Sequence, residues 1–63
     1  MNINREKVCL AMARKCYKTK DLAKKMGISR SRVNTILNSV NIQPSTIGKI
    51  AAALDVDVTE IIE

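Results

Sequence analysis

Four polar side chains near the middle of the chain share one face of a predicted helix: Arg30, Ser31, Asn34 and Thr35. An arginine guanidinium can donate two hydrogen bonds to O6 and N7 of guanine, which is worth about 1–3 kcal/mol of discrimination between bases. The other three side chains suit adenine edges or thymine methyl groups. The apolar residues of the segment form the opposite edge: Val33, Ile36 and Leu37. This pattern is typical of a helix that presents polar groups to bases while its back packs against a core.

The segment Thr19–Ser39, TKDLAKKMGISRSRVNTILNS, predicts two short helices joined by a tight turn. The first helix spans about residues 20–26, and Gly27 stands where a helix ends in a left-handed residue. Ser29 is a good N-cap for the second helix, which ends near residues 38–39, where an asparagine tolerates left-handed geometry. This layout predicts a helix-turn-helix whose second helix enters the major groove of DNA.

Apolar spacing predicts three more helices and no strand, so we expect a compact all-α fold of five helices and one domain over residues 1–63. The first helix covers about residues 4–16, the fourth is capped by Ser45 or Thr46 and includes Leu54, and Asp57 with Glu60 makes a capping-box start for the fifth. Pro44 is expected in the loop before the fourth helix. The expected inward residues of the first, second, fourth and fifth helices are Val8, Ala11, Met12, Leu22, Ala23, Met26, Ile47, Ile50, Ala51, Leu54, Val58, Ile61 and Ile62, and Leu10 and Ala13 widen the first apolar stripe.

The composition argues against enzyme and cofactor chemistry. A chain of 63 residues has no room for an enclosed catalytic pocket. Histidine, the usual general base and the commonest metal ligand, is absent. We therefore expect no enzymatic activity, no cofactor, no metal site and no small-molecule ligand. Tyr17 is the only aromatic residue, which argues against modules that stack bases on aromatic platforms.

Cysteine usage and hydropathy favour a cytoplasmic protein. Cys9 and Cys16 are seven residues apart in a predicted helix, so their backbones stand about 10 Å apart, too far for a disulfide. We expect two reduced, partly buried thiols. The longest apolar run, residues 8–13, is too short for a signal peptide or a membrane span, so no membrane association is expected.

The formal net charge of +5 is unevenly distributed. Basic side chains concentrate between residues 14 and 32, where Asp21 is the only carboxylate, whereas residues 33–63 are acidic apart from Lys49. A run of charge is often only a solvated surface, and Lys24 and Lys25 fit that interpretation. The coincidence of the basic block with the helix-turn-helix instead favours an electrostatic footprint for DNA phosphates.

The chain resembles the lambda-repressor-like, or Cro/XRE-type, DNA-binding domains of bacterial and phage regulators. The resemblance covers residues 8–62 and rests on the segments DLAKKMGISRSRVNTILN, QPSTIGKIAAALDV and DVTEII. Similar domains have an L-A-x-x-x-G segment, a serine or threonine cap and an apolar residue four positions later. In this chain those features fall on Leu22-Ala23, Gly27, Ser29 and Val33.

The resemblance also implies which residues contact DNA. Bases are read from the outward face of the third helix, which carries Arg30, Ser31, Asn34 and Thr35. The start of the second helix falls on Thr19 and Lys20, and backbone N–H groups there favour anions. Phosphates are held by the segment after the third helix: Asn38, Ser39, Asn41 and Gln43. Lys18, Ser29 and Arg32 flank these positions, and Arg32 points toward a phosphate rather than a base.

Two departures from the family pattern concern the contacts to DNA phosphates. Lys18 occupies the position before the second helix where relatives usually have a Ser or Asn cap, and Thr19 occupies the position of the usual glutamine. We therefore expect Thr19 to cap the helix, one residue later than in relatives. After the third helix, this chain has Ser39 where relatives usually have glycine, and Val40 where they often have a basic residue. We therefore expect weaker phosphate contacts there, compensated by Lys18, Lys20 and Lys24.

A third departure lies in the expected core. Many relatives bury an arginine of the first helix against a glutamate of the third, and these positions are Met12 and Leu37. Replacing a buried ion pair with well-packed apolar side chains is often neutral or stabilising. We therefore predict that Met12 and Leu37 touch in the core.

These observations predict a small transcriptional regulator, a repressor, that binds a double-stranded DNA operator sequence-specifically. Such a small module gains affinity from paired half-sites about 34 Å apart, which suggests a homodimer. Leu10, Ile61 and Ile62 are candidates either for core burial or for a dimer contact. An alternative function on the same fold is a protein-interaction module, such as an antitoxin or a partner of another regulator, and the polar face would then be a solvated helix surface.

Overall fold

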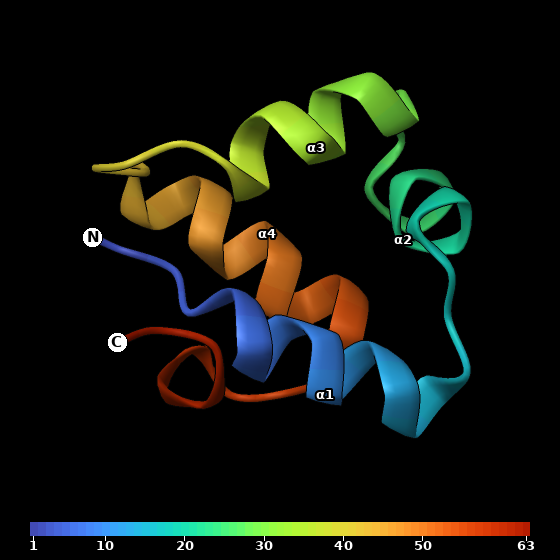
Figure 1. Ribbon diagram of the computed structural model, residues 1–63, viewed down its shortest axis with the longest axis horizontal. Coiled ribbons are helices and arrows are strands. Elements are labelled where there is room, and N and C mark those ends of the chain that lie inside the picture. The colour runs from blue at the N-terminus through green and yellow to red at the C-terminus, as the bar shows by residue number, and fades with distance from the viewer.

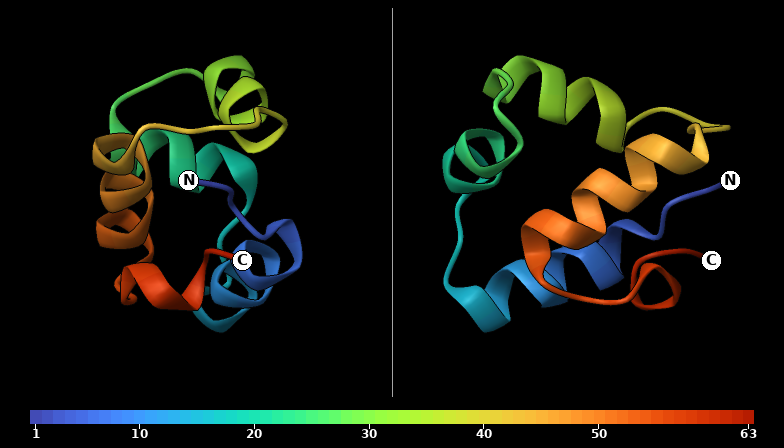
Figure 2. Two further views of the ribbon diagram at one scale, coloured as in Figure 1. Left: turned by 90° about the vertical axis from the view of Figure 1, so that its left-hand side faces the viewer. Right: turned by 180° about the vertical axis from the view of Figure 1, so that it is seen from behind.

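The computed structural model describes residues 1–63 as four α-helices and a short terminal turn of 3₁₀-helix (Figure 1). The elements are α1 (Arg5–Lys15), α2 (Thr19–Met26), α3 (Arg30–Leu37), α4 (Pro44–Leu54) and η1 (Val58–Glu60). α2 packs against both α3 and α4, and α4 also contacts α1 and η1. In the left view of Figure 2, α4 runs along one side of the molecule, while α3 and α1 lie on the other.

One hydrophobic cluster fills the space between the helices. It comprises Ile3, Val8, Ala11, Leu22, Ala23, Val33, Ile42, Ile47, Ile50, Ala51, Leu54 and Ile61. The periodic positions of α4 are all buried, as predicted. Ile3 and Ile42 belong to no helix, which is why helical periodicity does not identify them. Leu10 and Ala13 are exposed, so the expectation that they widen the apolar stripe of α1 is wrong.

The ends of the helix-turn-helix follow the predicted capping chemistry. Gly27 ends α2 in the left-handed region at φ 71°, which glycine adopts without steric cost. The Ser29 hydroxyl accepts a hydrogen bond from the Arg32 N–H at 3.1 Å and so caps α3. The prediction of a left-handed asparagine at the end of α3 is wrong, because Asn38 is right-handed and Asn41, three residues later, has φ 56°.

Two helices begin earlier than predicted. Thr19 is the first residue of α2, not its cap; Lys18 is the N-cap, and its backbone N–H donates to Asp21 Oδ2 at 2.8 Å. The acidic side chain inside the helix thus satisfies the N–H of the cap residue, which is half of a capping box, while no cap side chain accepts from the first turn. The prediction that Ser45 or Thr46 caps α4 is wrong: Gln43 is the N-cap and α4 begins at Pro44, because proline fits the first turn, where its missing N–H has no partner to lose.

The predicted fifth helix is only the 3₁₀ turn η1. The expected capping box is present, since Asp57 accepts from the Thr59 N–H at 2.9 Å and Glu60 accepts from the Asp57 N–H at 3.0 Å. The helix does not continue because the chain then pairs with the N-terminal segment. The Asn4 N–H donates to the Ile61 carbonyl at 2.8 Å, and Ile3 and Ile62 form an antiparallel bridge. This pairing requires an extended backbone, so the residues after η1 cannot also continue the helix.

Side-chain burial corrects one further prediction and leaves another open. Cys9 and Cys16 are free thiols, as expected, but both are exposed rather than partly buried. Met12 and Leu37 are partly buried and pack against the hydrophobic cluster, as the loss of the ion pair requires. Their direct contact stays a prediction.

Candidate nucleic-acid interface

The outer face of α3 carries the four predicted base-reading residues. Arg30, Ser31, Asn34 and Thr35 are all exposed, whereas Val33 on the same helix retains only 2% of its surface. Ile36 and Leu37 are half-buried against the core. The helix is therefore anchored along one edge and presents polar side chains along the other, as the spacing predicted.

The turn between α2 and α3 holds this face in position. The Ile28 N–H donates to the Ala23 carbonyl at 3.0 Å, and the Ile28 side chain packs against the hydrophobic cluster. α2 and α3 also pack against each other. The anchored turn limits how α3 can move relative to α2.

Hydrogen bonds within α3 distinguish the four polar side chains. The Thr35 hydroxyl donates to the Ser31 carbonyl at 2.9 Å, which leaves its lone pairs and its methyl group for a ligand. The side chains of Arg30, Ser31 and Asn34 have no hydrogen-bond partner, so their donors and acceptors are available. Arg30 and Asn34 are the strongest base-reading candidates, because each can form two hydrogen bonds to one base.

The flank at the start of α2 is basic and accessible. Lys18 and Lys20 are exposed and Thr19 is half-buried. The first N–H groups of any helix lack intrahelical partners, and they attract anions. Ser29 and Arg32 are exposed at the start of α3. The beginnings of two consecutive helices therefore both present donors to solvent.

The flank after α3 contains the predicted polar residues and one unpredicted cation. Asn38, Ser39, Asn41 and Gln43 are exposed. Asn38 Oδ1 accepts a hydrogen bond at 2.8 Å from the Arg5 guanidinium, which lies 33 positions away in the sequence. Sequence patterns do not indicate this contact, because Arg5 reads only as a charged residue in the first turn of a helix.

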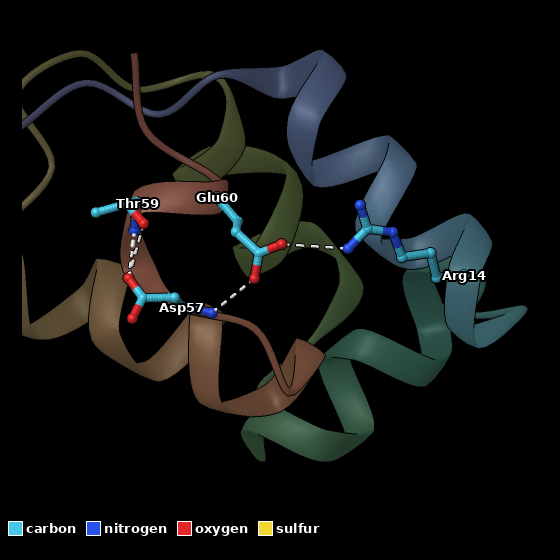
Figure 3. A network of polar contacts seen from close by, with 4 residues as sticks. All are labelled: Arg14, Asp57, Thr59 and Glu60. Atoms are coloured by element: carbon cyan, nitrogen blue, oxygen red, sulfur yellow. Dashed lines mark hydrogen bonds and ion pairs between the residues drawn. The ribbon is translucent and has the colours of Figure 1, made fainter.

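The basic residues between positions 14 and 32 fall into two groups. Arg14 forms a salt bridge with Glu60, and Lys15 forms one with Asp55, so these two cations serve contacts to the acidic end of the chain (Figure 3 shows the first). The basic residues that belong to α2, α3 and their caps form no salt bridge. Their charges remain available for an anionic partner.

A model of the Cro/C1-type helix-turn-helix DNA-binding domain matches residues 10–63. The chain belongs to this family. Neither the curated proteins nor the solved structures gave a match. The family binds DNA and is not enzymatic, and its helix-turn-helix corresponds in this chain to α2 and α3. None of the helices has the length and apolar character needed to span a lipid bilayer.

Proposed function

We propose that the protein is a transcriptional regulator, a repressor, that recognises a specific double-stranded DNA sequence by inserting α3 into the major groove. The observation that carries this proposal is the outer face of α3. It places two arginines and three uncharged polar side chains in solvent, with no acidic residue in the helix, while Val33 anchors the back. A repressor needs only to occupy its operator, and an exposed reading face is what that task requires.

The roles of the polar residues follow from their chemistry and position. Arg30, at the start of α3, donates in parallel to O6 and N7 of a guanine. Asn34 pairs with an adenine edge, one turn further along the helix. Ser31 and Thr35 contact adenine edges or thymine methyl groups between them. Base discrimination therefore depends mainly on Arg30 and Asn34, whose side chains are free of other contacts.

Phosphates on either side of the groove are contacted by the two flanks. Lys18, Thr19 and Lys20 contact the backbone at the start of α2, with Ser29 and Arg32 beside them. The segment after α3 contacts the second strand through the exposed polar residues Asn38, Ser39, Asn41 and Gln43. These contacts position the helix but carry no sequence information.

Two copies on paired half-sites would give the affinity that one small module lacks. The molecule is 24 Å along its longest axis, so one copy covers a single half-site and a second lies about 34 Å away. Leu10 is the exposed apolar candidate for the contact between copies, at 63% exposure, whereas Ile61 is fully buried and serves the core. Because a regulator acts where its operator lies, we propose a cytoplasmic location.

Selection of bound duplexes from random DNA at physiological salt tests the proposal. We expect a short enriched sequence, with two copies of it about one helical turn apart if the protein binds as a dimer. Affinity for the enriched duplex should fall steeply with salt. Failure of the wild-type protein to enrich any sequence, or to bind DNA in a salt-dependent way, would refute the proposal. Tight capture of a protein partner by variants altered on the outer face of α3 would then support the protein-interaction alternative.

A further inference from the structure

The segment after α3 has no basic residue of its own. The next basic residue after Arg32 in the sequence is Lys49, which lies within α4. Phosphate contacts from this segment would therefore depend on neutral amides and hydroxyls alone. Charged hydrogen bonds are roughly twice as strong as neutral ones, so this flank needs a cation from elsewhere to match the lysine-rich flank at α2.

The fold supplies such a cation from the beginning of α1. In both Figure 1 and the left view of Figure 2, the start of α1 lies below the end of α3. The Arg5 guanidinium donates to Asn38 Oδ1 at 2.8 Å and forms no salt bridge. One of its five N–H groups is used by this bond, and the others remain exposed. Asn38 keeps both donors of its amide nitrogen. The pair thus presents a positive charge and several donors at one place.

The chain before Arg5 holds the same segment from the other side. The backbone nitrogen of Met1 donates to the Ile42 carbonyl at 3.0 Å, and the Ile42 N–H donates back to Met1 at 2.9 Å. The Asn41 N–H donates to Asn2 Oδ1 at 3.2 Å. Three hydrogen bonds and the Arg5 contact therefore fix residues 38–42 against the N-terminal segment. A segment held in this way presents its donors in one arrangement.

We propose that Arg5 is a phosphate-contacting residue of the DNA interface, acting together with Asn38, and that residues 1–2 position the segment that carries Asn38. This inference rests on the proposed function. Arginine suits the role because its planar guanidinium donates two parallel hydrogen bonds to a phosphate. Arg5 then replaces the basic residue that relatives often carry where this chain has Val40.

Carboxylates near Arg5 weaken the binding of a phosphate there. Glu6 and Glu63 line the same open hollow as Arg5 and Asn38. Their negative charges oppose an approaching phosphate without forming a close pair with Arg5. Replacing Glu6 with glutamine should therefore strengthen DNA binding, with an increase at low salt that disappears as salt is raised.

The salt dependence of DNA affinity tests the role of Arg5. Fluorescence anisotropy with a labelled duplex, from about 50 to 200 mM salt, would compare wild type, Arg5→Ala and Arg14→Ala. The two variants lose the same charge from the same helix, but Arg14 is directed toward Glu60. We expect the slope of log affinity against log salt to fall by about 1 in Arg5→Ala and to be unchanged in Arg14→Ala.

The variant Arg5→Lys distinguishes a contact between Arg5 and a phosphate from a role of Arg5 that is limited to holding Asn38 in place. Lysine keeps the charge, so the wild-type slope should return, although the affinity stays lower because the planar donor fork is lost. Equal slopes for Arg5→Ala and Arg14→Ala, with wild-type DNA binding intact, would overturn the inference while leaving the proposed function in place. Absence of DNA binding by the wild-type protein would overturn both.

Discussion

The helices α3 and α4 use their residues in opposite ways. α4 buries four side chains almost completely, Ile47, Ile50, Ala51 and Leu54, and contains one charged residue. α3 buries only Val33, and most of its other residues are polar and exposed. Both helices are amphipathic, but α4 buries many of its side chains in the core, whereas α3 exposes most of its side chains to solvent. The comparison shows that stability and recognition are assigned to different helices, so that substitutions can affect one without the other.

Truncation in α4 should have the largest effect. Ile50 is 1% exposed, so Ile50→Ala should lower the free energy of unfolding by about 2–5 kcal/mol. Small domains often have little more than 5 kcal/mol in total, so much of the variant should be unfolded at room temperature. Thermal unfolding followed by circular dichroism measures the loss. A fall of the same size from Asn34→Ala would contradict the division between the two helices.

Truncation at the start of α3 should affect binding and not folding. Arg30→Ala should weaken affinity for the selected duplex by about 1–3 kcal/mol, with a smaller loss on a scrambled duplex. Arg32→Ala is the matched control, because a phosphate contact should weaken binding to both duplexes equally. Anisotropy titrations of both variants on both duplexes measure these losses. Equal behaviour of the two variants would show that Arg30 reads no base.

The cap of α3 contributes to stability although it lies on the helix that carries recognition. Ser29→Ala removes the acceptor of the Arg32 N–H and should cost about 1 kcal/mol of stability. That corresponds to a lowering of the unfolding midpoint by about 4–8 °C in a domain of this size. Ser45→Ala in the first turn of α4 is the control, because the Ser45 side chain forms no hydrogen bond. A midpoint shift no larger for Ser29→Ala than for Ser45→Ala would show that the cap contributes nothing.

The acidic end of the chain should give the smallest effect. Hydrogen bonds from the backbone N–H and then the hydroxyl of Thr59 lower the pKa of Asp57 below its usual value (Figure 3). A lowered pKa means that the ionised carboxylate adds stability above the unfolded value of about 3.9, and this is lost as pH falls through the folded pKa. Asp57→Asn should therefore flatten the acid side of the stability curve, as thermal midpoints below about pH 5 would show. If the pH dependence of the thermal midpoint below about pH 5 were the same in Asp57→Asn as in wild type, Asp57 would not be its cause.

Local patterns predicted the parts of the fold that depend on neighbouring residues. The spacing of Ile47, Ile50 and Leu54 identifies the buried face of α4, and Gly27 and Ser29 identify the turn, because periodicity and capping act within a few positions. The same reasoning placed the exposed polar face on α3.

Contacts between distant segments could not be predicted in this way. The pairing of Ile3 with Ile62 shortens the expected fifth helix to a turn, and it depends on residues almost a full chain length apart. The contact between Arg5 and Asn38 depends on how the fold places the start of α1 near the end of α3, for which no local signal exists. The candidate site is thus predictable on α3 itself and unpredictable where a second element completes it.

The central claim is that the outer face of α3 is the surface that DNA contacts. Backbone amide chemical shifts, recorded while the protein is titrated with the selected duplex, test it most directly. The account predicts that the changes concentrate on residues 30–35, the start of α2 and the segment 38–43, while the C-terminal half of α4 and η1 change little. Changes confined to the outer face of α1 and to η1, with residues 30–35 unaffected, would contradict it.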